Sequence, residues 1–379
     1  MSNAFWHGFA DMHAIERDGP VVITRGQGSW VWDQHGTKYF DAAGALWYVN
    51  VGHGRREIGE AMAAQVALIA SYSSFGDCTT ATTIELANTI ASLAPNPDSK
   101  VFFTLGGSDA IDSAIKIARR YWTLKGKPAK QAIIFRDNGY HGMNVGGTSI
   151  AGIGPNNDGY GDLVGNAHKV SWDDADDVIA TIDRLGEDNI AALFCEPVMG
   201  AGGVRIAGEA YLTAIRKACL ERDILFVADE VITGFGRCGD WFASNRFHLE
   251  PDMMTVAKGL TSGYAPMGAV IAAPSVWREF YREGVGMFRH GFTYGGHATS
   301  AAAGLANIKI MADERLPQHV AGLEDTFAAA VRSLEDLPSV AEVRTGVGFL
   351  AGIQLAEPAT APARYVACRT AGVLSRPIW

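Results

Sequence analysis

The chain has 379 residues, of which 48% are hydrophobic and 19% charged, and its formal net charge is −9. This length can bury a large core, and one large domain with a smaller attached one is expected rather than a string of small domains. The acidic balance argues against a surface that binds nucleic acid.

The cysteines and the ends of the chain favour a reducing compartment. The five cysteines are scattered and form no CxxC pair, so neither a disulfide framework nor a zinc site is expected. Residues 1–19 lack a basic segment followed by an apolar one, and no run of eighteen apolar residues occurs, so neither a signal peptide nor a membrane span is expected. We therefore predict a cytoplasmic enzyme with no metal ion, nucleic acid or membrane among its partners.

Predicted elements begin with two antiparallel strands within residues 21–41, which turn at 26–28 and are followed by a second turn at His35-Gly36. Residues 56–70 have a helical pattern, and from about residue 84 onward apolar strands alternate with helices. The strands are expected at 101–104, 132–135, 191–195, 224–228, 254–257 and 269–273, and the helices at 109–122, 174–185 and 209–222.

This alternation is typical of an α/β domain with a mostly parallel sheet that helices cover on both faces. After about residue 315 the pattern changes to a helix over 318–334 and short strands around 342–344 and 349–355. The run AEPATAPAR (356–364) is predicted to be a linker. We expect residues 71–312 to form the large domain, and residues 1–70 and 313–379 to form a smaller one together.

An acid and a lysine stand at the ends of two predicted strands. Asp229 closes the apolar run 224–228 and opens DEVITGFGRC, and Lys258 follows twenty-nine positions later in MMTVAKGL. Open α/β sheets place their ligands at the carboxyl ends of strands. For Asp229, a surface turn or helix cap is an equally common explanation.

Lys258 follows mostly apolar residues, whereas the other nine lysines fit ordinary solvated side chains. Partial desolvation would lower the pKa of Lys258 and make its amine a nucleophile. The alternative is a lysine that reaches water from a strand end. A desolvated Lys258 together with Asp229 is what a pyridoxal phosphate enzyme needs, since the carboxylate keeps the cofactor's ring nitrogen protonated and the amine forms a Schiff base.

Three other segments follow predicted strands. Gly106-Gly107-Ser108 opens a helix, whose free N–H groups and dipole favour a phosphate, although such a sequence is more often only a cap. Tyr140-His141 follows strand 132–135, where an aromatic side chain either stacks on a planar ring or packs in the core. Glu196 ends strand 191–195 and either lines the site or is a loop acid.

In this order the segments resemble the class III aminotransferases of the pyridoxal phosphate fold-type I superfamily, over about residues 19–376. The most specific segments are DEVITGFGR, AKGLTSGYAPMGAV and HGFTYGGHATSAAAGLAN (290–307). The resemblance implies a large, mostly parallel seven-stranded sheet domain that binds pyridoxal phosphate, and a smaller α+β domain made from the N- and C-terminal segments.

The resemblance also implies roles at the cofactor. Lys258 would form the Schiff base and Asp229 would contact the pyridine nitrogen. The other expected cofactor contacts are Val231 and Tyr140 on the two ring faces, Gly107 and Ser108 on the phosphate, and His141, Glu196 and Phe292 nearby. Thr293 would reach the phosphate of a neighbouring subunit, so a homodimer or tetramer is expected.

Within the class, the sequence most resembles the ω-amino acid and amine:pyruvate branch. Trp47 matches that branch's substrate-pocket tryptophan, and Arg376 matches its mobile arginine, which binds a carboxylate and swings away for neutral amines. Ile232 stands where the ornithine enzymes have glutamine. The implied activity is ping-pong transamination from an ω-amino acid or primary amine to a keto acid, pyruvate by analogy.

Two alternatives remain at this stage. One is an enzyme of the same class with decarboxylase or aminomutase chemistry. The other is a catalytically silent dimer of the same fold, because the sequence stops at Trp379, before the family's final strand and helix. In that case we expect an incomplete small domain and Arg376 on a frayed segment.

Overall fold

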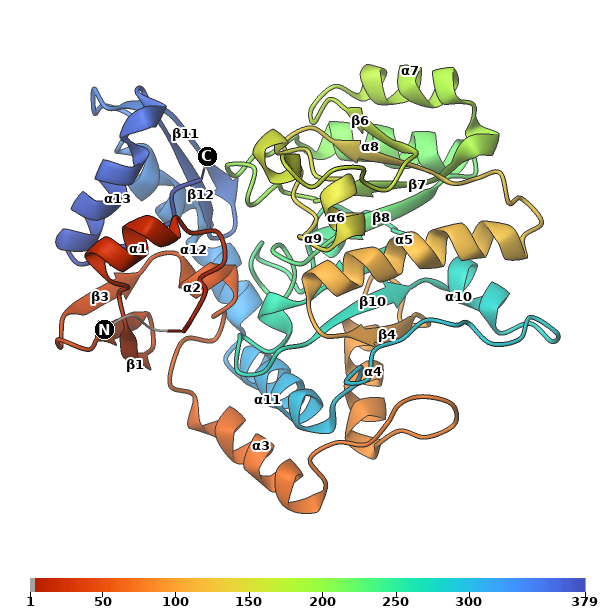
Figure 1. Cartoon of the computed structure of the whole chain (residues 1–379), viewed down its shortest axis with the longest axis horizontal. Coiled ribbons are helices and arrows are strands. Elements are labelled where there is room, and N and C mark those ends of the chain that lie inside the picture. The colour runs from red at the N-terminus through yellow and green to blue at the C-terminus, as the bar shows by residue number, and fades with distance from the viewer. Residues whose placement is uncertain (1–3, 379) are drawn as a thin grey trace.

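A seven-stranded sheet dominates the computed structural model, which describes residues 4–378 (Figure 1). The strand order is β4-β10-β9-β8-β7-β5-β6, and β10 alone runs antiparallel to its neighbours in this sheet. Its strands are β4 (Lys100–Thr104), β5 (Ala132–Arg136), β6 (Ala167–Val170), β7 (Ile190–Cys195), β8 (Leu225–Asp229), β9 (Met253–Val256) and β10 (Gly268–Ala272). The mostly parallel seven-stranded sheet is confirmed; β6 was not expected from the sequence.

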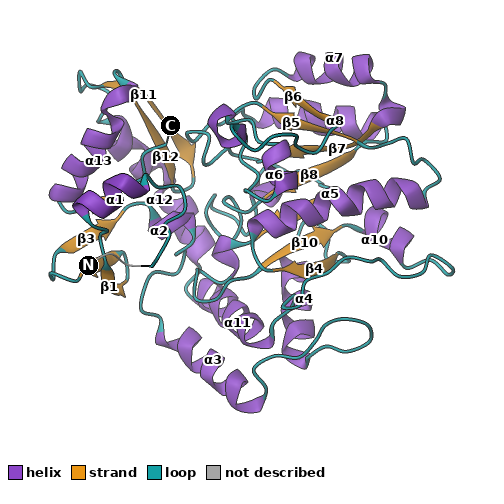
Figure 2. Ribbon diagram, in the orientation of Figure 1, coloured by secondary structure: helices purple, strands orange, loops and turns teal. Residues whose placement is uncertain are grey.

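Helices cover both faces of this sheet (Figure 2). Alternate residues of each strand enter two separate apolar clusters, so that Ile133 and Phe135 of β5 face one side while Ile134 faces the other. The first face is covered by α5 (Gly107–Leu124) and α10 (Pro274–Phe280), and the second by α4 (Ala81–Leu93), α7 (Ala175–Leu185), α8 (Glu209–Glu221) and α11 (Ala298–Asp313). Burial on both faces explains why the strands are continuous apolar runs in the sequence.

Helix α7 shows how local sequence sets an element. The Asp174 carboxylate accepts hydrogen bonds from the backbone N–H groups of Asp176 (2.9 Å) and Asp177 (3.4 Å), which caps the helix. Val178 and Ile182, four residues apart, are buried against the sheet. Gly186, at φ 79°, ends the helix in a conformation that favours glycine.

The first and last segments of the chain meet in a second, four-stranded sheet of order β1-β2-β3-β13 (Figure 1). Its strands are β1 (Ile23–Gln27), β2 (Trp30–Asp33), β3 (Lys38–Asp41) and β13 (Val373–Leu374), with β13 parallel to β3. A two-stranded sheet of β11 (Val340–Val347) and β12 (Leu350–Leu355) follows α12 (Leu316–Arg332).

The remaining elements are shorter or lie outside the two larger sheets. The helices are α1 (Met12–Asp18), α2 (Gly44–Trp47), α3 (Arg56–Leu68), α6 (Val145–Ser149), α9 (Ala243–Arg246) and α13 (Ala361–Thr370), and the 3₁₀ turns are Gly154–Asn157, Glu187–Asn189, Lys258–Leu260 and Pro358–Thr360. Within residues 4–378, no helix is long and apolar enough to cross a membrane.

Two local predictions were wrong. Residues 356–364 are not a linker, because a 3₁₀ turn and the first part of α13 occupy them. Proline is tolerated in the first turn of a helix, where Pro362 lies, and alanine favours the helix that follows. The first hairpin turns at Gly28-Ser29, since Gln27 pairs with Trp30, rather than at 26–28. The expectations that rested on Trp379 fall outside the described residues.

Two leucines of α8 test how much the packing of this helix against the large sheet contributes to stability. Leu212 is fully buried, whereas Leu220 on the same helix is 68% exposed. We expect Leu212→Ala to lower the free energy of unfolding by about 2–5 kcal/mol, because it leaves a cavity. Leu220→Ala should change it by less than about 0.5 kcal/mol. Urea unfolding of the two variants measures the difference, and equal losses would contradict the assigned packing.

Candidate active site

The carboxyl ends of β4, β5, β7, β8 and β9 meet at one edge of the large sheet, beside a cavity of about 370 Å³. Ten of the twelve predicted site residues line this cavity. They are Trp47, Gly107, Ser108, Tyr140, His141, Glu196, Asp229, Val231, Lys258 and Arg376. Parallel pairing brings these strand ends together although the residues are far apart in the sequence.

Asp229 is the last residue of β8 and is 4% exposed. Its Oδ1 accepts hydrogen bonds from Val231 N (3.1 Å) and Thr255 Oγ1 (3.2 Å). Its Oδ2 lies 2.8 Å from Nδ1 of His141, which is 1% exposed. His141 therefore stands behind Asp229 as its hydrogen-bond partner, a relation that the sequence did not predict.

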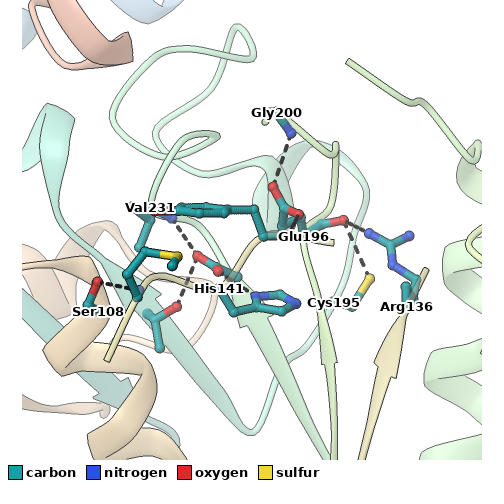
Figure 3. Close-up of polar contacts among 11 residues, drawn as sticks. Ser108, Arg136, His141, Cys195, Glu196, Gly200 and Val231 are labelled. Carbon is teal, nitrogen blue, oxygen red and sulfur yellow. Dashed lines mark hydrogen bonds and ion pairs between the residues drawn. The ribbon is translucent and has the colours of Figure 1, made fainter. Parts of the chain in front are cut away.

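Glu196 lines the cavity and connects two loops, and Figure 3 shows its contact with Gly200. Its Oε1 accepts a hydrogen bond from Tyr140 N and its Oε2 one from Gly200 N, both at 3.0 Å. Burial raises the pKa of Glu196 above its usual value. The carbonyl oxygen of Glu196 accepts a hydrogen bond from Nη2 of the buried Arg136. These contacts fix the loop that carries Tyr140 and His141.

Lys258 is the catalytic candidate of the cavity. It follows β9 with φ 44°, a positive value that is rare for a residue other than glycine. Nζ makes no hydrogen bond within residues 4–378 and lies 5.5 Å from the centroid of the Trp47 ring. Desolvation lowers the pKa of Lys258 to about 8, against the opposing effects of Asp229 and Glu196. An amine with this pKa has a larger unprotonated, nucleophilic fraction near neutral pH than an ordinary lysine, and the unprotonated form predominates above about pH 8.

Lys130 corrects the expectation that the other nine lysines are solvated. Its side chain is 1% exposed, Nζ donates a hydrogen bond to the Glu187 carbonyl oxygen at 2.8 Å, and it lies 4.3 Å from the Trp122 ring centroid. Burial also lowers the pKa of Lys130. Position relative to the cavity, rather than burial, distinguishes Lys258.

The first turn of α5 forms a seat for an anion at the cavity. Gly107 and Ser108 of this turn line the cavity, and the first N–H groups of a helix have no partner within it, so the turn can bind an anion. Ser108 Oγ accepts a hydrogen bond from Met143 N at 3.1 Å, which leaves the hydroxyl hydrogen available to a ligand. A Cβ atom at Gly142 would lie 2.5 Å from Ser108 Oγ, so only glycine permits this close approach. Val231 lies against the same turn, because a Cβ atom added at Gly107 would be only 3.0 Å from Val231 Cγ1.

Trp47 and Arg376 form the other end of the cavity, and Arg376 Cζ lies 5.4 Å from the centroid of the Trp47 ring. Arg376 follows β13 by two residues, and the pairing of β13 with β3 holds this segment. Arg376 makes no ion pair within the described part of the chain, so its guanidinium is free for a ligand.

Phe292 and Thr293 do not lie in this cavity. Phe292 stacks edge-on with His290 at 5.3 Å. Thr293 lines a second hollow, of about 320 Å³, together with Ser71, Tyr72, Ser73, Phe75, Tyr294 and His297. Neither residue contacts the predicted phosphate seat of the same chain.

Sequence reasoning missed several residues that line the cavity. They are Phe9, Leu46, Ile111, Gly142, Ile153, Pro155, Asn156, Ala201, Ala257, Pro377 and Ile378. Ile232, which stands where the ornithine enzymes have glutamine, also lines the cavity. Most stand on loops without a periodic pattern, so no local signal in the sequence marked them. Among residues 4–378, no group of histidine, cysteine and acidic side chains could hold a metal ion.

The model of the family described as "Aminotransferase class-III" matches residues 13–378. The chain belongs to the class III aminotransferases. The chain is similar to a putrescine–pyruvate aminotransferase of Pseudomonas aeruginosa, at 39% identity over 92% of this chain and 79% of the relative. It is also similar to an omega-amino acid–pyruvate aminotransferase of Pseudomonas putida, at 36% identity over 93% and 83% of the two chains.

Solved structures agree with this membership. An (S)-enantioselective omega-transaminase from Thermomicrobium roseum superposes with a TM-score of 0.94 at 34% identity, over 98% of this chain and 88% of the other. A PLP-bound amine transaminase from an uncultivated Pseudomonas species gives a TM-score of 0.94 at 34% identity, over 100% and 92%. The fold is therefore that of fold-type I transaminases.

The class III aminotransferases use pyridoxal phosphate, and this chain is a pyridoxal-phosphate-dependent aminotransferase. The residues of the cavity fit that cofactor. Among the described residues, the cavity offers a desolvated amine without a hydrogen-bond partner at Lys258, a helix N-terminus for the phosphate, and a buried carboxylate at Asp229. When bound, pyridoxal phosphate supplies the electron sink for carbanion chemistry.

The pKa of Lys258 predicts how the reactivity of its amine depends on pH in the cofactor-free enzyme. The unprotonated fraction should rise through a midpoint of about 8, because desolvation disfavours the charged form. Labelling with an amine-reactive reagent at a series of pH values, read by peptide mass spectrometry, measures this midpoint. Lys127 is the internal control, since its hydrogen bond with Asp223 raises its pKa. A Lys258 midpoint as high as that of Lys127 would contradict the desolvated site.

Proposed function

We propose that this chain transfers an amino group from an ω-amino acid or primary amine to a keto acid, with pyruvate as the acceptor, in the cytoplasm. The observation that carries the proposal is the joint position of Lys258, Trp47 and Arg376 in one cavity. The Trp47 ring stands 5.5 Å from the Lys258 amine and 5.4 Å from the Arg376 guanidinium. A reactive amine and a cation that can bind a carboxylate thus both lie within about 5.5 Å of the centroid of one aromatic ring.

The proposed cofactor site uses the residues at the strand ends. Gly107 and Ser108 bind the phosphate, Val231 and Tyr140 cover the two ring faces, and Asp229 binds the ring nitrogen. His141 orients the Asp229 carboxylate, and Glu196 fixes the loop of Tyr140. In this proposal residues 71–312 form the cofactor-binding domain, and residues 1–70 and 313–379 form the smaller one.

Lys258 has two proposed tasks at this site. Its amine holds the cofactor before the substrate arrives, and once displaced it moves the proton at the substrate carbon. Lowering of its pKa by desolvation keeps the amine able to accept a proton near neutral pH. A positioned base of this kind contributes about 10²–10⁴-fold to the rate.

Arg376 is proposed to recognise carboxylates. It is an exposed side chain without an ion pair in the described residues, and its Cζ lies 5.4 Å from the centroid of the Trp47 ring. A guanidinium binds a carboxylate with two parallel hydrogen bonds. Because Arg376 is not tied to an acidic residue, it can move away when the donor is a neutral amine.

The working unit is proposed to be a homodimer or tetramer. Thr293, which lies outside the cavity of its own chain, would reach the cofactor phosphate of a neighbouring subunit, with Phe292 beside it. Exposed aromatic side chains support this, since Tyr72, Phe75 and Tyr294 around the same hollow are each more than half exposed. Such an apolar patch is typical of a subunit contact.

Removal of the Lys258 amine tests the proposed chemistry. Lys258→Ala should abolish turnover and the visible absorbance of the bound cofactor, because no other amine lies in the described cavity. Lys130→Gln is the matched control, since it alters the other buried lysine but keeps a donor for the Glu187 carbonyl oxygen. Turnover by Lys258→Ala with pyruvate, followed as alanine formation, would overturn the proposal.

Replacement of Arg376 tests substrate recognition. Arg376→Ala should raise KM for pyruvate and for ω-amino acids by about tenfold or more, because a charge-assisted hydrogen bond is lost. The KM for a simple primary amine should change little. Arg369→Ala is the control, as Arg369 lies on α13 and packs on Tyr365 rather than at the cavity. Equal effects of Arg376→Ala on both donor classes would remove Arg376 from this role.

A further inference from the structure

The backbone that carries Trp47 has an unusual conformation. Gly44, Ala45 and Trp47 all have positive φ values, and Ala45, at φ 55° and ψ −82°, lies outside the regions that L-residues normally occupy. Such a conformation persists only when surrounding contacts hold it. The segment also lines the cavity through Leu46 and Trp47, so whatever holds it also sets the shape of the substrate end.

Asp41, the last residue of β3, holds this turn. Its Oδ2 accepts a hydrogen bond from Ala45 N at 2.8 Å and lies 2.9 Å from Nε2 of His53. The Asp41 side chain is only 6% exposed. His53 is itself fixed, because it exchanges two backbone hydrogen bonds of 2.9 Å with Gly28 in the hairpin between β1 and β2. The carboxylate thus connects the strained turn to the small sheet.

The same residue adjoins the segment of Arg376. In the parallel pairing of β3 with β13, Asp41 stands opposite Leu374, two residues before Arg376. Ala43 N, two residues after Asp41, donates a hydrogen bond to the Leu374 carbonyl oxygen at 3.1 Å. Trp47 and Arg376 come from opposite ends of the chain, but both segments leave the small sheet at Asp41.

We propose that Asp41 is a positioning residue for substrate recognition, which holds Trp47 and Arg376 at their spacing across the substrate end of the cavity. Neither Asp41 nor His53 lines that cavity, so Asp41 acts through the segments it holds. The inference rests on the proposed function in one respect, namely that Arg376 binds a substrate carboxylate. It adds a determinant of substrate affinity that lies outside the cavity.

Asp33 provides a matched control in the same sheet. Like Asp41 it is the last residue of its strand and is buried, and its Oδ1 accepts hydrogen bonds from His35 N and Thr37 N, both at 2.9 Å. Its Oδ2 accepts a hydrogen bond from Tyr39 Oη at 2.8 Å. The turn that Asp33 holds does not line the cavity. A general loss of stability would therefore follow from either substitution, whereas a loss of substrate affinity would follow only from that of Asp41.

The experiment compares Asp41→Asn and Asp33→Asn in the cofactor-loaded enzyme. Asp41→Asn should raise KM for pyruvate by about tenfold, since a charge-assisted contact is lost and the turn relaxes. Its kcat and its dissociation constant for pyridoxal phosphate, from spectral titration, should stay near those of the unmodified enzyme. Asp33→Asn should leave KM unchanged. Equal KM values in both variants, or a parallel fall of kcat and cofactor affinity in Asp41→Asn, would overturn the inference.

Hydrogen–deuterium exchange gives a readout that does not depend on activity. Asp41→Asn should accelerate exchange in peptides that cover residues 42–50 and 372–376, and Asp33→Asn should not. Unchanged exchange there would overturn the inference even if KM rises. If the unmodified enzyme shows no turnover with pyruvate, the proposed function fails, while exchange still decides the role of Asp41.

A second pair of variants covers the case in which Asp41→Asn does not fold. His53→Phe removes the ring nitrogen that contacts Asp41 but keeps an aromatic ring close to Gly26. A Cβ atom added at Gly26 would lie only 2.7 Å from His53 Cβ, so the two residues are in close contact. His53→Gln keeps an N–H donor. We expect His53→Phe to raise KM for pyruvate and to accelerate exchange over residues 42–50. His53→Gln should leave both quantities closer to those of the unmodified enzyme. Identical behaviour of the two variants would overturn the inference.

Discussion

The parallel pairing of β8 with β9 is the constraint on which the site depends. It places Asp229 opposite Thr255, three residues before Lys258, so that the acid and the amine reach the same edge of the sheet. Neighbouring parallel strands add the loops of Tyr140 and Glu196 at this edge, and α5 adds its N-terminus. Glu196, Asp229 and Lys258 lie at or just after the ends of β7, β8 and β9, strands whose side chains are buried on both faces.

Burial of charge gives the site its chemistry and also its cost. Removal of ionisable groups from water disfavours their charged forms, so burial lowers the pKa of Lys258 and raises that of Glu196. Hydrogen bonds offset part of this cost at the carboxylates, where Asp229 contacts His141 and Glu196 accepts two backbone N–H groups. Lys258 has no such partner, and its amine therefore remains reactive.

The substrate end of the cavity comes from a different part of the fold than the cofactor end. Trp47 belongs to a strained turn after β3, and Arg376 follows β13, so the small sheet sets their spacing. In the proposed function, this division separates the chemistry at Asp229 and Lys258, which the large sheet carries, from substrate recognition at Trp47 and Arg376, which the small sheet supports. It allows substrate preference to change through the small sheet while the strand ends that carry Asp229 and Lys258 stay in place.

The sequence by itself determined the mostly parallel sheet, because apolar runs alternate with helical periodicity, and it marked Asp229, Lys258 and Gly107-Ser108, because those residue types directly follow apolar strands. Tertiary structure alone decided the contact of His141 with Asp229, the burial of Lys130 and the role of Asp41 as the point where two distant segments meet. The physical reason is that local periodicity reports which residues face a core. Hydrogen bonds between segments that are 88 residues apart, as for His141 and Asp229, depend on strand order and register, which no local pattern encodes.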